Sequence, residues 1–218
     1  MKKIVIIPAY NEQGSIVETI KDIKTNAPKF DYIVINDCSK DNTLKICREK
    51  GIHVLNLPIN LGIGGAVQTG YLYAYRNNYD IAVQFDGDGQ HDAKFLEMMA
   101  ETLERDKLDM VIGSRFIENE GFQSSAVRRF GIRFFEVFIK ILFGQRITDA
   151  TSGMRMCNRK VMELFIKDYP KDYPEPETVS RLLRHKYKVK EVPVVMRERQ
   201  AGVSSISSLG KSVYYMCK

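Results

Sequence analysis

Two carboxylates separated by one glycine, Asp86 and Asp88, are the residues of this sequence best suited to chemistry. They follow an apolar run at 81–85 that is typical of a buried strand, and the glycines after each of them allow a sharp turn. Two neighbouring negative charges are costly without a cation, and oxygen ligands favour Mg²⁺ or Mn²⁺ over zinc. A cation held there would bind a diphosphate. The alternative interpretation is an ordinary Asp-Gly turn.

The composition is that of one soluble globular domain: 218 residues, 44% hydrophobic and 28% charged. The net charge of +6 fits an anionic partner such as a nucleotide, a lipid phosphate, a membrane surface or nucleic acid, and selects none of them. The four cysteines lack metal-type spacing and are expected to be reduced, as in a cytoplasmic protein. The sequence contains no signal peptide and no apolar run of about 18 residues that would span a membrane.

Short apolar, β-branched runs alternate with helical patterns, which predicts an α/β fold with a mostly parallel sheet flanked by helices. The predicted strands are 4–7, 32–35, 53–57, 81–85 and 110–112. The predicted helices are 15–24, 43–50, 64–77 and 93–105. Each strand ends in polar residues or glycines, and open α/β sheets bind ligands at the carboxyl ends of their strands. After about residue 114 the alternation weakens, and we predict a more irregular layer with a helix at 178–185 and a strand at 189–196.

Five polar motifs occur in order at 7–12, 36–43, 60–62, 86–90 and 113–115. Together they resemble the family-2 inverting glycosyltransferases of the GT-A fold, from Lys3 to about Ser205. Within that family the chain is most similar to the polyprenyl-phosphate sugar synthases. The resemblance implies one domain over 1–218, with a nucleotide-sugar-binding half at 1–115 and an acceptor-binding, membrane-facing half at 116–218.

The resemblance implies a nucleotide pocket formed by the first two motifs. The residues that would line it are Pro8, Tyr10, Asn11 and Glu12. Asp37 would accept hydrogen bonds from the base, with Ser39 shaping the loop. Because a carboxylate suits the imide or amino edge of uracil or guanine, the donor would be a UDP- or GDP-sugar. A turn followed by a helix cap is the alternative interpretation of residues 37–42.

The family's metal triad, Asp-x-Asp-x-Gln, is matched by Asp86, Asp88 and Gln90. The implied Mg²⁺ or Mn²⁺ would bridge the donor phosphates, so that Asp86 also serves nucleotide binding, and would stabilise charge on the departing diphosphate. Arg115 is expected to reach a phosphate and assist catalysis, with a surface ion pair as the alternative. Gly62, at a helix start, would allow close approach of phosphate, although simple loop geometry explains it equally well.

Residues 149–155 match the family's Asp-x-x-Ser-Gly-x-Arg element, which would form the floor of the acceptor site. Asp149 would lie near the reacting centre, while Ser152 and Arg155 would help to hold the acceptor phosphate. A phosphate acceptor is already an anion, whereas a sugar hydroxyl needs a base. Asp149 is therefore a general base or a positioning group according to the acceptor, and an Asx turn is the alternative.

Three arginines, Arg128, Arg129 and Arg133, precede a strongly apolar segment at 134–143. On a helix this segment has one narrow polar stripe, a pattern typical of a helix lying on a membrane. A helix packed on the sheet is the alternative. The arginines are candidates for binding the phosphate of a polyprenyl-phosphate acceptor. We therefore expect a cytoplasmic protein in peripheral contact with the inner face of the membrane, and an oligomer is compatible with the sequence.

Residues 199–204 resemble the family's Arg-x-x-Gly-x-Ser element, which folds over the donor diphosphate. By that match Arg199 and Ser204 would contact the nucleotide. Many lipid-linked members of the family continue into transmembrane helices, whereas this sequence ends at Lys218. A shortened chain and a peripheral membrane enzyme are the two explanations.

We therefore expect a metal-dependent inverting glycosyltransferase that moves a hexose from a UDP- or GDP-sugar to polyprenyl phosphate. One alternative is a family-2 enzyme acting on a polysaccharide hydroxyl. A sugar-1-phosphate nucleotidyltransferase is disfavoured because it needs a glycine-rich basic loop where this chain has residues 8–12. A non-catalytic membrane or nucleic-acid binder would leave the carboxylate pair without a role, and no nucleic-acid partner is expected.

Overall fold

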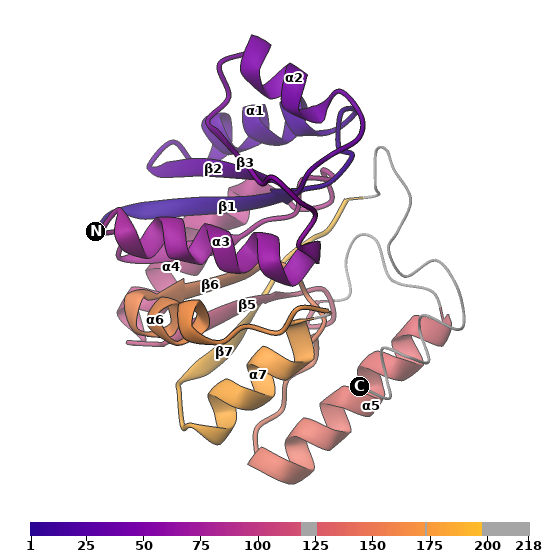
Figure 1. Ribbon diagram of the computed structural model, residues 1–218. Coiled ribbons are helices and arrows are strands. Elements are labelled where there is room, and N and C mark those ends of the chain that lie inside the picture. The colour runs from indigo at the N-terminus through magenta and orange to yellow at the C-terminus, as the bar shows by residue number, and fades with distance from the viewer. Residues whose placement is uncertain (119–125, 173, 198–218) are drawn as a thin grey trace.

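Seven strands form one mixed sheet at the centre of the protein (Figure 1). The computed structural model describes residues 1–118, 126–172 and 174–197. Across the sheet the strands follow the order β3-β2-β1-β4-β6-β5-β7. Their bounds are β1 Lys3–Ala9, β2 Phe30–Asn36, β3 Val54–Asn56, β4 Ile81–Gln84, β5 Met110–Ser114, β6 Arg155–Asn158 and β7 Val189–Pro193. The predicted α/β class with a mostly parallel sheet is confirmed.

Helices cover both faces of the sheet. Their bounds are α1 Ile16–Asn26, α2 Thr43–Glu49, α3 Gly62–Arg76, α4 Leu96–Arg105, α5 Ala126–Phe143, α6 Arg159–Lys167 and α7 Pro174–Arg184. The side chains of α1, α2 and α4 belong to one buried core, and those of α3, α6 and α7 belong to the other. Figure 1 shows α5 at the periphery of the molecule, beside α7.

One strand, β6, runs antiparallel between β4 and β5, whereas the other neighbouring pairs are parallel. Because β6 is reversed, the turn that precedes it lies at the edge where β4 and β5 end. Arg155, the first residue of β6, is thus opposite Gln84 on one side and Ile112 on the other. The predicted acceptor element at 149–155 is thereby brought beside the predicted metal loop.

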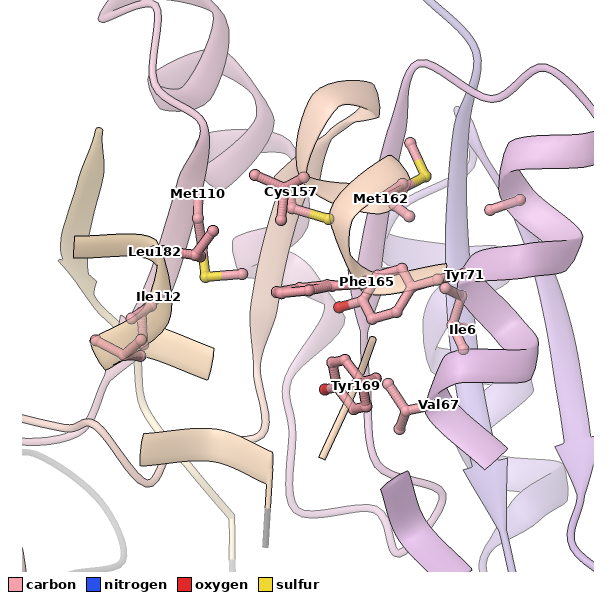
Figure 2. Packing of buried hydrophobic residues seen from close by; sticks show 14 of the residues in the cluster. Ile6, Val67, Tyr71, Met110, Ile112, Cys157, Met162, Phe165, Tyr169 and Leu182 are labelled. Atoms are coloured by element: carbon pink, nitrogen blue, oxygen red, sulfur yellow. The ribbon is translucent and has the colours of Figure 1, made fainter. Parts of the chain in front are cut away.

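An aromatic group fixes α3 and α6 against the sheet. Figure 2 shows Tyr71 of α3, Phe165 of α6 and Tyr169 packed together. The ring centroids are 5.2 Å apart for Tyr71 and Phe165, 5.8 Å for Tyr71 and Tyr169, and 5.0 Å for Phe165 and Tyr169. All three pairs are tilted or edge-to-face, which is the favoured arrangement of aromatic rings. Because alternate residues of each strand point to opposite faces, β1 contributes to both cores. This packing sets the amino end of α3 at the carboxyl edge of the sheet.

The elements of the first half agree with the sequence-based prediction, apart from small shifts of their bounds. The second half is more regular than predicted, because β6 and α6 were not foreseen. The four residues of β6, Arg-Met-Cys-Asn, include no β-branched side chain, so strand propensity does not reveal them. Helix α7 begins already at Pro174, since proline is well tolerated in a first turn, and β7 ends at Pro193 rather than at 196.

Helix α5 has one buried and one exposed apolar face. Ile132 and Ile139 are buried against the body of the protein. The outward face carries large apolar side chains that are between 48% and 76% exposed: Phe134, Val137, Phe138, Ile141 and Leu142. Within the described residues, no helix is long and apolar enough to cross a bilayer.

The contact of α3 with β1 leaves no space for a side chain at Gly70. A Cβ atom placed there would lie 2.1 Å from Cγ2 of Ile6. We expect Gly70→Ala to lower the free energy of unfolding by about 1–3 kcal/mol, because overpacking forces the strand and helix apart. Urea unfolding followed by circular dichroism measures this. In an Ile6→Ala background the penalty should shrink, because Cγ2 is gone, and an equal penalty in both backgrounds would contradict the explanation.

Candidate active site

The loops that follow β1 and β2 are joined by backbone-to-side-chain hydrogen bonds. The backbone N–H of Asn11 donates to Ser39 Oγ at 3.0 Å, and Asn11 Oδ1 accepts from the Lys40 N–H at 2.8 Å. The next N–H, that of Glu12, donates to Thr43 Oγ1 at 2.8 Å. Asn11 has a positive φ of 58°, a conformation that asparagine tolerates better than most residues. Two of the predicted nucleotide-binding motifs thus form one rigid surface, from which Tyr10 projects into solvent.

Asp37 fixes the third predicted loop. Its Oδ1 atom accepts the backbone N–H of Leu61 at 2.7 Å, and its backbone carbonyl accepts from Asn60 Nδ2 at 3.0 Å. Burial raises the pKa of the Asp37 carboxyl above its ordinary value, and the hydrogen bonds from Leu61 and Gly62 offset part of that rise. Asp37 therefore holds Gly62 and the start of α3 in place, next to the surface where a nucleotide base is expected.

The predicted metal loop begins directly after β4. The Asp86 side chain is 37% exposed, and its Oδ2 atom lies 3.2 Å from His91 Nε2. Asp88 is buried, and its Oδ1 atom accepts the backbone N–H of Gln90 at 3.0 Å. The residue between the two carboxylates packs against β1, because a Cβ at Gly87 would lie 3.2 Å from the Pro8 carbonyl oxygen. The loop is therefore ordered, with one carboxylate presented to solvent.

The acceptor element packs directly on this loop. A Cβ atom at Gly153 would lie 2.5 Å from Oδ2 of Asp86, so any larger residue there would displace that carboxylate. In the part of the chain that the structure describes, no three His, Cys, Asp or Glu side chains gather closely enough to hold a metal. Mg²⁺ and Mn²⁺ fit such an oxygen site nonetheless, because Mg²⁺ typically takes one or two carboxylates and completes its shell with water and phosphate.

A buried ion pair joins the end of β5 to the turn before β6. Arg115 Nε and Nη2 donate to the two carboxylate oxygens of Asp149, each at 2.7 Å. Asp149 is 0% exposed and also accepts from the backbone N–H of Arg115 and the hydroxyl of Thr151. The sequence analysis predicted that Arg115 contacts a phosphate, with an ion pair at the surface as the alternative. In the structure the Nε and Nη2 atoms are engaged by Asp149 in a buried ion pair, and a phosphate contact of Arg115 stays a prediction.

Glu191 of β7 supports the turn that carries Asp149, a role that the sequence analysis did not predict. Its two oxygens accept the backbone N–H groups of Thr148 and Asp149, both at 2.7 Å. The Thr148 hydroxyl donates to it as well, at 3.0 Å. Burial raises the pKa of Glu191, as does the nearby Asp149 charge, while these hydrogen bonds act in the opposite direction. No sequence motif marks Glu191, because its partners lie more than forty residues earlier in the chain.

Arg155 and Ser152, which were predicted to hold the acceptor phosphate, make contacts within the protein. The Arg155 guanidinium is enclosed and donates to three backbone carbonyls and to Thr178 Oγ1 at 2.5–2.7 Å. Ser152 is equally buried, and its hydroxyl accepts the N–H of Met154 at 3.2 Å. Through these contacts Arg155 ties the turn before β6 to α7. The phosphate-binding role of Arg155 and Ser152 stays a prediction.

The other residues that were predicted to bind phosphate or nucleotide lie on α5 or outside the described residues. Arg133 is exposed on α5. Arg128 and Arg129 belong to α5, but their side chains are outside the described part of the structure. Arg199 and Ser204 also lie outside the described residues. Their assignments to acceptor phosphate and nucleotide remain predictions.

Comparison with known proteins identifies the chain. The model of the family described as glycosyl transferase family 2 matches residues 4–165. The protein is a family-2 glycosyltransferase. The matched segment contains the loops of β1, β2 and β4 together with the Arg115–Asp149 pair.

Relatives with named activities are similar to this glycosyltransferase over most of their length. The undecaprenyl-phosphate mannosyltransferase of Micrococcus luteus is 28% identical over 95% of this chain and 88% of its own. The UDP-N-acetylglucosamine–dolichyl-phosphate N-acetylglucosaminyltransferase of Methanococcus voltae is 30% identical over 87% and 83%. Glucosyl-3-phosphoglycerate synthase from Mycobacterium tuberculosis, solved with Mn²⁺, UDP and phosphoglyceric acid, has a TM-score of 0.74 at 17% identity, covering 99% and 78%. That likeness shows the shared fold.

The glycosyltransferase thus gathers most of its predicted site residues at one edge of the sheet. Pro8 lies at the carboxyl end of β1 itself, and Asn11, Asp37, Asp86 and Asp149 lie in loops at the carboxyl ends of β1, β2 and β4 or beside β5. The sequence analysis missed those contacts that connect the loops to one another. Examples are Glu191 below Asp149 and Gly153 against the first carboxylate.

Asp37→Asn should remove a pH-dependent loss of stability. Because the folded-state pKa is raised above the ordinary 3.8, the folded protein binds more protons than the unfolded chain between these two values. Its free energy of unfolding therefore falls as pH rises through that window. The asparagine keeps an oxygen for Leu61 but does not titrate. The difference in unfolding free energy, wild type minus variant, should fall with rising pH and then level off. Urea unfolding at a series of pH values measures it, and a difference that increases with pH would contradict the assignment.

Proposed function

We propose that this glycosyltransferase transfers a hexose from a UDP- or GDP-sugar to polyprenyl phosphate, with inversion and with the help of Mg²⁺ or Mn²⁺. The named activities of its relatives from Micrococcus luteus and Methanococcus voltae, which use undecaprenyl and dolichyl phosphates, support this acceptor. The ordered carboxylate loop after β4 supports the cation.

The observation that favours a phosphate acceptor over a sugar hydroxyl is the state of Asp149. Both of its oxygens accept from the Arg115 guanidinium, and it has no solvent exposure. To act as a general base it would have to break a buried ion pair. A phosphate oxygen is already an anion and needs no base. An acceptor that carries its own negative charge therefore fits this site better.

The residues then have separate tasks. Asp86 and Asp88, with the side chain of Gln90, would hold the cation, which supplies positive charge to the departing diphosphate. The loops at Asn11 and Asp37 would hold the nucleoside. The acceptor oxygen forms a bond to the anomeric carbon from the side opposite the diphosphate, which leaves with the bonding electron pair. The Arg115–Asp149 pair would keep the acceptor turn aligned for this attack.

We further propose that α5 contacts the inner face of the membrane. Its outward face presents large apolar side chains to solvent, with Ile141 76% exposed. The same helix carries exposed Arg133 and Lys140, and Arg146 follows closely after it. An apolar face bordered by cations suits the boundary between lipid head groups and acyl chains. Such a surface would bring the site to a lipid-bound acceptor.

The activity is tested with purified protein, Mn²⁺, a panel of UDP- and GDP-sugars, and either polyprenyl phosphate or a saccharide as acceptor. We expect a lipid-linked sugar with one of the donors. Asp88→Asn should reduce turnover by about 100-fold, because it replaces an anionic metal ligand with a neutral amide oxygen. Asp80→Asn is the matched control, since Asp80 precedes β4 at the opposite edge of the sheet.

Activity confined to a saccharide hydroxyl would overturn the lipid part of the proposal. In that case Asp149→Asn should abolish turnover while the protein remains folded, as expected for a general base. Full activity in the presence of a chelator would overturn the metal part.

Membrane contact is tested by co-sedimentation with vesicles that contain anionic lipid. We expect Phe138→Glu combined with Ile141→Glu to weaken vesicle binding by more than tenfold, because each buried large apolar side chain contributes about 1.5–3 kcal/mol. Ile59→Glu, at an exposed isoleucine outside α5, is the control and should bind as the wild type does. Unchanged binding of the double variant would contradict the proposal, and a loss of self-association instead would assign this face to a second copy.

A further inference from the structure

Arg197, which follows β7, reaches across to the carboxylate loop after β4. Its backbone N–H donates to the carbonyl oxygen of Gln90 at 2.8 Å. Its guanidinium lies 3.2 Å from Asp22 Oδ2 and 3.0 Å from Asp92 Oδ1. One arginine therefore bridges α1 and the far end of the loop that carries Asp86 and Asp88.

The two carboxylates in this bridge are largely buried. The side chain of Asp22 is 13% exposed and that of Asp92 is 9% exposed. Both also bind the short turn that follows the loop, because Asp22 Oδ2 accepts the N–H of Ala93 and Asp92 Oδ1 accepts the N–H of Lys94. Without the guanidinium, Asp22 would lose this cation, and Asp92 would keep only the more exposed Lys94, whose Nζ lies 3.2 Å from its Oδ2. Repulsion between the two poorly hydrated carboxylates would then push the loop away from α1.

Packing on this side of the loop is incomplete, although Ala93 just after it is buried in the core. A cavity of about 240 Å³ lies between α1 and the loop, lined by Thr19, Asp22, Gly89, His91 and Arg197 among others. The near end of the loop is fixed by a hydrogen bond from Thr19 Oγ1 to the Gly87 carbonyl at 3.2 Å. The far end depends on the polar contacts of Arg197 and Asp22.

We propose that Arg197 is a positioning residue for the divalent cation: by bridging Asp22 and Asp92, it holds Asp86, Asp88 and Gln90 in the arrangement that binds the ion. The inference rests on the proposed function, because it assumes that this loop is the metal site. It assigns Arg197 no contact with the ion or the substrate.

The proposal makes a prediction opposite in sign to that of simple electrostatics. Arg197 is a positive charge close to a cation site, so its removal should tighten Mn²⁺ binding if charge alone matters. If Arg197 positions the loop, its removal should weaken Mn²⁺ binding. The sign of the change in Mn²⁺ affinity therefore separates the two effects.

The experiment measures Mn²⁺ binding to the full chain by electron paramagnetic resonance of the free ion, with UDP or GDP present and no sugar. We expect Arg197→Gln to weaken binding on the order of tenfold, as outer-shell partners of metal sites typically do. Arg197→Lys should lose less, because it keeps the charge. Adding Asp22→Asn to Arg197→Gln should recover part of the loss, since it removes the repulsion and keeps an acceptor for Ala93. Arg105→Gln, which breaks an exposed ion pair elsewhere, is the control.

Each outcome has one meaning. Unchanged or tighter Mn²⁺ binding in Arg197→Gln would overturn the positioning role while leaving the proposed function intact. Absence of Mn²⁺ binding in the wild type would overturn the metal-dependent function itself. Urea unfolding of each variant accompanies the titration, and if Arg197→Gln does not fold, weaker binding by the folded Arg197→Lys variant supports the proposal, whereas wild-type affinity overturns it.

Discussion

The buried ion pair of Arg115 and Asp149 is the contact on which the organisation of the site depends. Removing two charges from water is expensive unless each is matched and fully hydrogen-bonded. Here the guanidinium donates twice to the carboxylate, and a backbone N–H and the Thr151 hydroxyl donate to it as well. The end of β5 and the turn before β6 meet these requirements together. The pair therefore sets the position of the acceptor element relative to the sheet.

The reversed strand β6 makes this pair available. Because β6 is antiparallel and lies between β4 and β5, its preceding turn meets the carboxylate loop and Arg115 at one edge. Glu191 of the neighbouring edge strand β7 then accepts the two N–H groups of the turn. Three strands that are far apart in the sequence, β5, β6 and β7, thus support this one turn.

Much of this could be predicted from the sequence, and the limits have physical causes. The alternation of apolar runs with helical patterns indicates the α/β class, and polar residues at strand ends indicate the edge where the site lies. Asp37 and Asp86 were located in this way, because their position depends on local sequence. Strand β6 was missed because its four residues have weak strand propensity and are stabilised by neighbours on both sides.

The roles of single side chains were harder to predict, because these depend on partners distant in the sequence. The guanidinium of Arg155 is chemically able to bind either a phosphate or backbone carbonyls. Only the fold shows that it donates to three backbone carbonyls. Glu191 and Arg197 belong to no local pattern and act on loops from other parts of the chain.

The close approach of Gly153 to the Asp86 carboxylate has a consequence for redesign of the enzyme. In the proposed function, the backbone at Gly153 separates the acceptor turn directly from the carboxylate of the donor side. A larger residue introduced to alter acceptor choice would displace the carboxylate that serves the donor. Under the proposed function, α5 is therefore the safer place to alter acceptor choice, because its exposed face lies away from this contact.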